Sequence, residues 1–276
     1  MPALRKKKIV LGKSGAMTST LRCFQVLELL AEDPFELSVS EIAELLTMPR
    51  ASAHRLCKTL VEGGFIEAVP ASKRYSLTPK SLWVGSGYLR HSSIYRASFF
   101  PMQSLAKQIP GTAQLGVLSE DKVLFIHSVG YPGSTEAFAD VGLKRALHAT
   151  ASGKLFLAEM PLVKVEQLMS QGVERYTERT TVSFVQLMDE LKQIKIKGYA
   201  VNDEELLPGY LALAAPVFNS SASMVATISI TVASDHQHRG YDSPHAGLLC
   251  EAARMTSLQL GYHPLSQNLQ VRRAKA

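Results

Sequence analysis

Two short amphipathic segments near the start of the chain show its clearest periodic pattern. Ser38 and Glu41 have the spacing of a helix capping box, and apolar residues follow them at helical intervals. Pro49 suits the first turn of a second helix, in which apolar residues recur at the same intervals and basic residues face outward. Two short helices, a tight turn and a basic second helix predict a helix-turn-helix. The apolar positions are Val39, Ile42, Ala43, Leu46, Ala53, Leu56, Cys57 and Leu60.

The flanking residues complete a predicted winged domain over residues 18–78. Gly63 and Gly64 end the second helix. Two short runs of strand-forming residues on either side of a turn at residues 70–73 then predict a hairpin, the wing. Before the helix pair, further apolar residues predict a helix over residues 21–31 that packs behind it. These residues are Leu21, Phe24, Val26, Leu27 and Leu30.

Residues 79–93 are predicted to form a linker helix. Pro79 opens the segment, and Leu82, Trp83 and Leu89 give it an apolar stripe. An apolar stripe without a core of its own often pairs with another subunit, which favours a dimerisation helix. The alternative is that the stripe packs against the wing of its own chain.

The second domain is predicted over residues 94–264 as an α+β fold. Runs of apolar residues bounded by turn signals alternate with helical patterns, and a sheet with helices packed around it is the economical arrangement. Gly198 ends the third of its helices, and Thr180 and Thr181 are candidate caps for that helix. The predicted helices are 94–108, 149–159, 182–196 and 244–260, and the predicted strands are 114–118, 123–129, 199–201, 212–218 and 225–232.

Composition excludes several classes of protein. The hydrophobic fraction of 46% supplies a core for each domain, and no apolar run approaches the ~20 residues that span a bilayer. The apolar run after the N-terminal basic cluster is too short for a secretory signal, so we expect a cytoplasmic protein without membrane contact. Cys23, Cys57 and Cys250 lack metal-site spacing and favour buried reduced thiols.

The basic charge of the chain is concentrated in the first domain. Residues 1–90 contain 13 Lys and Arg against 8 Asp and Glu, a net +5 of the total +6. This distribution suits phosphate contact, although a solvated basic surface would look the same. Residues 1–17 are predicted to be a disordered basic arm, either a solubilising tail or a source of phosphate contacts. Residues 265–276 are assigned as a tail.

Signature motifs of catalytic and cofactor sites are missing, and we expect no cofactor, metal or enzyme activity. The chain has no GxGxxG, Walker lysine loop, HExxH or GxSxG. An enzyme acting on small acids or esters through the second domain is the alternative function. A DNA-packaging protein without sequence preference is a third, less compatible with a near-neutral second domain. The residues available for catalysis are His127, His148, Ser152, Asp203, Glu204 and Glu205.

Five segments together resemble the IclR family of bacterial transcriptional regulators. SVSEIAELLTMPRASAHRLCKTLVEGGFIE and RYSLTP look like its winged helix-turn-helix, and VGLKRALHATASGK, GYAVNDEELLPGYLALAAPVF and VATISI look like its effector-binding domain. The resemblance runs from about Leu21 to Gly261. It implies a helix joining the winged domain to a larger GAF-like domain with a mainly antiparallel sheet flanked by helices. It also implies a homodimer or dimer of dimers that binds a promoter palindrome in double-stranded DNA and responds to a small metabolite, commonly a carboxylate.

The second helix and the wing tip supply the candidate DNA contacts. Arginine suits guanine edges, whereas lysine suits phosphates. Arg55 has an alternative, which is to turn inward to Glu41 or Glu62. The candidates are Arg50, Ala51, Ser52, His54, Arg55, Lys58, Lys73 and Arg74.

The resemblance also implies a set of effector-binding residues. Ser229 and Thr231 lie two apart on a predicted strand, so their hydroxyls share a face, and Ser152 lies at a helix start that suits a carboxylate. Alternatively, these hydroxyls have no ligand role, and Arg145 is merely solvated. The candidates are Ala151, Ser152, Asn202, Tyr210, Ala212, Ser229, Thr231 and Arg145.

The sequence departs from the family pattern at several of these positions. Asn202 replaces an acid, Ala212 stands where a thiol can occur, and Tyr210 replaces a smaller aliphatic residue, which predicts a pocket of different size and polarity. Thr47 and Thr78 stand where glycine is frequent, at the turn between the two helices and after the wing.

Overall fold

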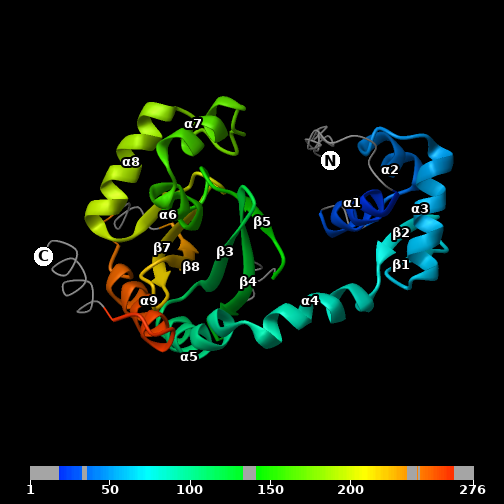
Figure 1. Cartoon of the computed structure of the whole chain (residues 1–276). Helices are drawn as coiled ribbons and strands as arrows, with labels where there is room; N and C mark the ends of the chain where they lie inside the picture. The colour runs from blue at the N-terminus through cyan, green and yellow to red at the C-terminus, as the bar shows by residue number, and fades with distance from the viewer. Residues whose placement is uncertain (1–18, 33–35, 133–140, 235–240, 242, 264–276) are drawn as a thin grey trace, which may run out of the picture. The chain divides into compact units, whose positions relative to one another are not determined.

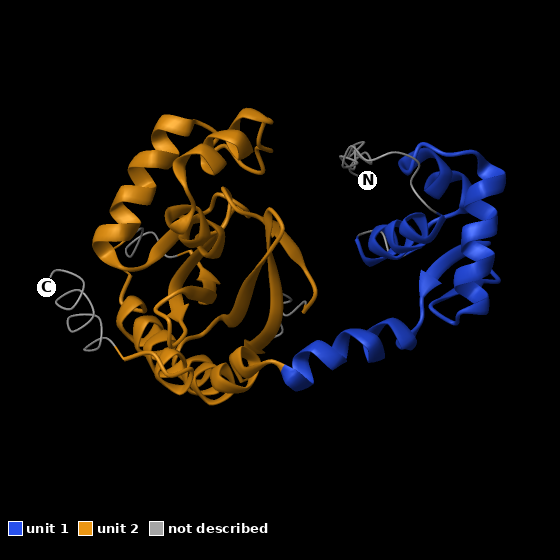
Figure 2. Ribbon diagram, in the orientation of Figure 1, with its two compact units in different colours: residues 1–91 blue, residues 92–276 orange. Residues whose placement is uncertain are grey.

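The computed structural model describes residues 19–32, 36–132, 141–234, 241 and 243–263. These residues belong to two compact units, 1–91 and 92–276 (Figures 1 and 2). The division falls after α4 (Pro79–His91), so the helix predicted as a linker is counted with the first unit. The predicted basic arm and C-terminal tail lie outside the described residues.

The first unit contains a helix-turn-helix followed by a wing (Figure 1). The Ser38 side chain accepts from the backbone N–H of Glu41, and the Glu41 carboxylate accepts from the backbone N–H of Ser38, which confirms the predicted capping box. All four apolar positions predicted for α3 are buried. The elements are α1 (Ser19–Ala31), α2 (Val39–Leu45), α3 (Arg50–Glu62), β1 (Ile66–Val69), β2 (Arg74–Leu77) and α4.

Two residues expected in the core of the first unit are exposed. Leu21 and Phe24 of α1 are 51% and 55% exposed, whereas Val26 and Leu30 are buried. At 100° per residue, Leu21 and Phe24 lie on the opposite side of the helix from Val26 and Leu30. The apolar residues of α1 therefore surround the helix, and only one side of it packs against α3.

The turn between α2 and α3 holds Thr47 in an unusual conformation. Its φ is +49°, in the left-handed region that glycine adopts readily and β-branched residues rarely adopt. The turn is closed by the Met48 backbone N–H, which donates to the Ala43 carbonyl at 2.9 Å. Thr47 thus takes the backbone conformation for which glycine would be the usual residue.

Thr78 and the first turn of α4 are bound to the two glycines that follow α3, the recognition helix of the helix-turn-helix. Thr78 Oγ1 donates to the Gly64 carbonyl at 2.6 Å, and Lys80 Nζ donates to the Gly63 carbonyl at 2.7 Å. Within the described first unit, however, α4 buries none of its residues. Its large exposed side chains are Leu82, Trp83, Val84 and Tyr88.

The second unit is a six-stranded antiparallel sheet in the order β5-β4-β3-β8-β7-β6, with helices on both faces (Figure 1). The antiparallel α+β prediction is thus confirmed. Helices α5 and α9 pack together against β3, β7 and β8, while α6 packs against β6, β7 and β8 beside α8. The strands are β3 (Thr112–Ser119), β4 (Lys122–Gly130), β5 (Lys144–Ala146), β6 (Ala200–Asp203), β7 (Tyr210–Phe218) and β8 (Met224–Ala233). The helices are α5 (Ser93–Gln108), α6 (Ala151–Glu159), α7 (Leu162–Ser170), α8 (Phe184–Lys197) and α9 (Ala246–Gln259).

Several details of the second unit differ from expectation. Strand β5 and helix α7 were not predicted, because three residues are too few for an alternating pattern and α7 is a short surface helix. The cap of α8 is Ser183 instead of Thr180 or Thr181. Those threonines bind elsewhere: Thr180 Oγ1 donates to the Glu205 carbonyl and Thr181 Oγ1 to the Glu190 carboxylate, both at 2.6 Å.

The first turn of α6 lies directly against the backbone of the preceding loop. A Cβ atom at Gly153 would lie 2.2 Å from the Leu147 carbonyl oxygen, so no other residue fits there without moving the helix. The Gly153 backbone N–H is bound by the side chain of the capping residue Thr150. This close packing fixes the start of α6, where the candidate ligand residues Ala151 and Ser152 are found.

Candidate DNA-binding face and ligand site

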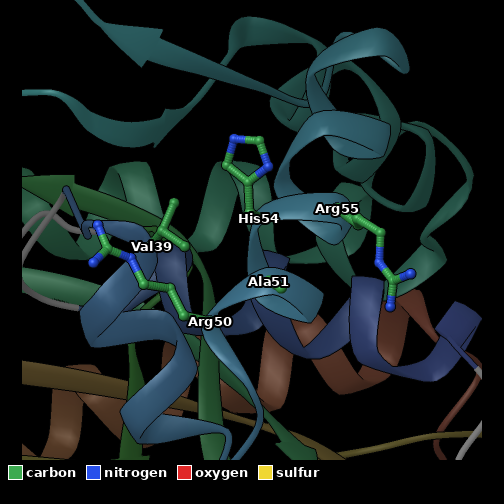
Figure 3. A pocket seen from close by; sticks show the side chains of 5 residues that line it. All are labelled: Val39, Arg50, Ala51, His54 and Arg55. Atoms are coloured by element: carbon green, nitrogen blue, oxygen red, sulfur yellow. The ribbon is translucent and has the colours of Figure 1, made fainter.

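The outer side of α3 carries most of the candidate DNA contacts. Figure 3 shows side chains of α3 extending beside Val39 of α2, and the residues in it line an open hollow of about 620 Å³. Ser52 is partly exposed. Basic, imidazole and small apolar groups on one helix face supply donors for guanine and phosphate and an apolar contact for a thymine methyl group. The exposed candidates are Arg50, Ala51, His54, Arg55 and Lys58.

The acidic residues that could have drawn Arg55 inward pair with other residues. Glu41 pairs with Arg74, and Glu62 lies 3.9 Å from Lys58 Nζ. Arg55 Nη2 lies 3.5 Å from Ser52 Oγ, on the exposed surface of the same helix. Arg55 therefore stays on the outer face of α3.

The two basic residues of the wing are placed differently. Lys73 is exposed at the hairpin tip with φ +54°. Arg74 is half-buried and binds Glu41 through both guanidinium nitrogens, with Nη2–Oε1 2.6 Å and Nη1–Oε2 3.0 Å. Burial is the largest single effect on Glu41 and raises its pKa, but the hydrogen bonds from Ser38 and the charge and hydrogen bonds of Arg74 together outweigh it and hold the pKa below its usual value. Arg74 is thus engaged within the domain, and its assignment as a DNA contact stays a prediction.

Five of the candidate ligand residues share one face of the sheet. Asn202, Ala212 and Thr231 lie opposite one another on β6, β7 and β8, and Ser229 and Tyr210 are each two residues from a member of this row. Ala212 packs into the core that contains Ala151 and Leu155 of α6. The sheet register and the packing of α6 therefore bring these residues to the same side of the unit as the start of α6.

Ser152 has the strongest indication of a ligand role. It lies in the first turn of α6, is 1% exposed, and its hydroxyl has no hydrogen-bond partner among the described residues. A buried hydroxyl without a partner is costly, and the start of a helix attracts negative charge. A carboxylate or similar acceptor at this position would satisfy both features.

Asn202 and Arg145 depart from the expected arrangement. The Asn202 amide nitrogen donates to the Ala149 carbonyl at 2.6 Å, and its oxygen accepts from the Glu205 backbone N–H at 3.2 Å. Asn202 therefore joins the loop before α6 to the end of β6. Arg145 lies on edge strand β5, separated from β8 by β4 and β3 and hence by about 14 Å. The sheet does not bring it beside the residues on β6, β7 and β8.

Comparison with known proteins agrees with both units. The helix-turn-helix domain model of the IclR family matches residues 19–70, and the model described as the C-terminal domain of the bacterial transcriptional regulator IclR matches residues 86–258. The chain belongs to the IclR family of bacterial transcriptional regulators.

Related proteins cover nearly the whole of this IclR-family chain. The regulator KdgR of Escherichia coli is 30% identical over 90% of this chain and 94% of its own length, and the repressor IclR of the same organism is 29% identical over 84% and 86%. An IclR regulator from Alicyclobacillus acidocaldarius has a TM-score of 0.78 at 28% identity, covering 89% of this chain and all of that one. A homologue from Microbacterium hydrocarbonoxydans, in complex with 4-hydroxybenzoate, has a TM-score of 0.73 at 22% identity over 88% and 99% of the two chains.

A buried charge cluster in this IclR-family protein was not anticipated from its sequence. Lys154 of α6 is 1% exposed, and its Nζ lies 2.5 Å from a carboxylate oxygen of Glu205 and 2.5 Å from one of Glu190. Burial raises the pKa of Glu205 by more than Lys154 lowers it, and Glu190 raises it further. An acidic run such as residues 203–205 would ordinarily be solvated, but Glu205 is buried. The sequence does contain one signal of this cluster, because Lys154 stands in a helix segment of otherwise small and apolar residues.

Apart from Ser152, the residues of the alternative enzyme hypothesis are engaged separately. His127 stacks on Phe99 of α5, whereas His148 binds the Glu174 carbonyl at 2.8 Å. Asp203 pairs with Arg179, and Glu204 accepts from Ser234. Burial lowers the pKa of both histidines. The described contacts do not join a base, a nucleophile and an orienting residue.

Neither metal-binding clusters nor membrane-spanning helices were predicted from the sequence. Among the described residues, no three His, Cys, Asp or Glu side chains are arranged to hold a metal ion. No described helix has the length and apolar character needed to cross a bilayer.

Proposed function

We propose that this IclR-family protein is a cytoplasmic, non-enzymatic regulator that binds a promoter palindrome and is switched by a small metabolite, most simply a carboxylate. The single observation that carries the switching part is the buried hydroxyl of Ser152 at the start of α6, which has no hydrogen-bond partner within the described ranges. The neighbour in complex with 4-hydroxybenzoate supports a carboxylate, because it shares the fold. The remaining surface is formed by Ala151, Tyr210, Ala212, Ser229 and Thr231, and Asn202 holds the loop before α6 in place through the Ala149 carbonyl.

Palindrome binding requires two recognition helices, and α4 offers a surface for pairing. Leu82, Trp83 and Val84 are 74%, 64% and 51% exposed, and Tyr88 lies one turn further along the helix. Such a stripe is costly in water and is buried when two copies pair, so we infer a homodimer or dimer of dimers. Sedimentation of the full chain with and without Trp83→Ser tests this: the variant shifts toward monomer. An assembly unchanged by the substitution would argue against pairing through α4.

The DNA-binding face is tested on a duplex selected by the wild-type chain from a random pool. Arg50→Ala is expected to lower affinity for this duplex by roughly tenfold, because a guanine contact is worth about 1–3 kcal/mol. Lys107→Ala removes one positive charge from the second unit and serves as the control. Equal small losses for both variants would mean that Arg50 contributes charge only, and the assigned face would be wrong.

The ligand site is tested by thermal shift with aromatic and aliphatic carboxylates, followed by DNA titration with each hit. Ser152→Ala is expected to reduce the shift caused by a hit. Ser98→Ala, which alters a buried serine of α5 whose hydroxyl is already bonded to the Tyr95 carbonyl, should keep that shift. A hit that stabilises both variants equally binds elsewhere. A hit that leaves DNA affinity unchanged would count against switching.

A further inference from the structure

The described part of the wing is joined to the helix-turn-helix and to the residues just before it by several contacts, of which the strongest is made to the Glu41 carboxylate. Arg74 of β2 binds both oxygens of Glu41, and its Nη1 also donates to the Glu36 carbonyl at 3.3 Å. Close by, Ser72 Oγ donates to the Glu36 carboxylate at 2.8 Å. A two-residue bridge between Leu37 and Tyr75 completes the connection, with backbone hydrogen bonds of 3.1 and 2.8 Å.

We propose that Arg74 is a positioning residue that acts through Glu41: it holds the wing at the angle from which Lys73 reaches a DNA phosphate, and it makes no DNA contact itself. This inference rests on the proposed DNA-binding face. It assigns different roles to Lys73 and Arg74, two adjacent basic residues that were both predicted to contact DNA.

The wing needs such an anchor because it is small. Its strands have four residues each, and an isolated two-stranded hairpin is only marginally stable in water. Lys73 immediately precedes Arg74. It is exposed at the hairpin tip, and its backbone is in the left-handed region. Because the two residues are neighbours, fixing the guanidinium on Glu41 also fixes where the Lys73 ammonium is presented.

The chemistry of the pair explains why arginine stands at this position. A planar guanidinium matches a carboxylate through two parallel hydrogen bonds, whereas an ammonium is a point charge without that orientation. Glu41 is also committed to the capping box of α2, so its position is already fixed by the start of a helix. Arg74 additionally neutralises a carboxylate that would otherwise repel phosphates near the recognition helix.

Glu41→Gln distinguishes a positioning role of Arg74 from a direct DNA contact, because the two roles predict opposite changes in DNA affinity. Glutamine retains the capping-box geometry but loses the charge that binds Arg74. If Arg74 positions the wing, this variant binds the selected duplex about fivefold more weakly. If Arg74 instead contacts DNA and the pair with Glu41 competes with that contact, the variant binds the duplex more tightly. Glu62→Gln is the matched control, because it removes the same charge from an exposed pair on α3 and should strengthen binding slightly.

Lys73→Ala in the wild-type and Glu41→Gln backgrounds provides the second readout. In the wild type it should lower the slope of log affinity against log salt by about 0.9, the value for one phosphate contact. In the Glu41→Gln background it should change the slope little, since Lys73 has already lost its position. Equal changes in both backgrounds would show that Lys73 does not depend on the pair and would overturn the proposal.

Arg74→Lys keeps the charge and leaves the capping box untouched, so it tests the proposal even where Glu41→Gln weakens folding. It should bind DNA more weakly than the wild type, with unchanged circular dichroism. Wild-type affinity would show that charge alone suffices, and positioning would be refuted. If the wild-type chain selects no duplex at all, the proposed DNA-binding face itself fails, which is a different outcome from any of these.

Discussion

Two glutamate–cation pairs, one in each unit, have nearly the same length and opposite electrostatics. Arg74–Glu41 is 2.6 Å long with side chains 33% and 30% exposed, and Lys154–Glu205 is 2.5 Å long with side chains 1% and 9% exposed. The pKa of Glu41 is lowered, whereas that of Glu205 is raised. Distance alone therefore does not determine whether a pair favours the charged carboxylate.

The difference comes from water and from the number of charges. For Glu41, burial is the largest single effect and raises the pKa, but the hydrogen bonds from Ser38 and the charge and hydrogen bonds of Arg74 together outweigh it. In the interior, Glu205 loses its hydration, and one lysine must serve two carboxylates, because Glu190 binds the same ammonium. The first pair orients a surface element at low cost, while the second joins α6 to the loop after β6 in the interior of the unit.

The largest expected effect on stability is that of Lys154→Ala, which removes the cation of the buried pair. Removing the cation leaves two carboxylates, one of them buried, without their partner, and we expect the free energy of unfolding to fall by about 3–5 kcal/mol. Denaturant unfolding followed by circular dichroism measures it. Lys192→Ala, which removes a lysine from an exposed pair with Asp189, should cost less than about 1 kcal/mol. Similar losses for the two variants would mean that the buried cluster is hydrated.

Arg74→Ala should have a smaller effect on stability, about 1 kcal/mol, because both partners are one-third exposed and the carboxylate left behind regains water. The same unfolding experiment applies, with the exposed Lys58→Ala as the control. A loss as large as that of Lys154→Ala would contradict the contrast between the pairs. This small stability change is what allows DNA affinity to report on wing position.

The smallest expected effect is an opposite pH dependence of two charge-neutralising variants. The raised pKa of Glu205 means that its contribution to stability is full below about pH 4.5, the usual glutamate value, and is lost as pH rises through the folded pKa. The lowered pKa of Glu41 means that its contribution is present above pH 4.5 and is lost as pH falls through the folded pKa.

The stability of Glu205→Gln relative to the wild type should therefore improve as pH rises, and that of Glu41→Gln should improve as pH falls. Unfolding of the three proteins at several values between about pH 3.5 and pH 7 measures both trends. Parallel trends would mean that the two carboxylates share an environment.

The parts predicted well from sequence are those set by neighbours along the chain. The capping box at Ser38 and the buried positions of α3 follow from spacing within one helix, and Gly198 ends α8 with φ +78° as expected. Leu21 and Phe24 were misplaced because an apolar residue on a helix indicates burial only when the packed side is known. The short strand β5 has too few residues to show a period.

The candidate sites illustrate the same limit. Ser229 and Thr231 were correctly placed on one face, because alternation along a strand is local. The partners of Arg74 and Lys154, and the Ala149 carbonyl that Asn202 binds, are tens of residues away in the chain, so these pairings depend on tertiary packing that no spacing rule contains. Residue type indicated that these groups were polar and of interest, but not what they would bind.

The backbone conformation of Thr47 lowers the stability of the first unit. A β-branched residue at φ +49° carries strain of about 1–2 kcal/mol that a glycine would not. Thr47 is exposed, and the turn contains none of the residues assigned to DNA. The winged domain is therefore less stable than its own fold permits, and an engineered, more heat-resistant version can begin at this turn while the recognition surface is left unchanged.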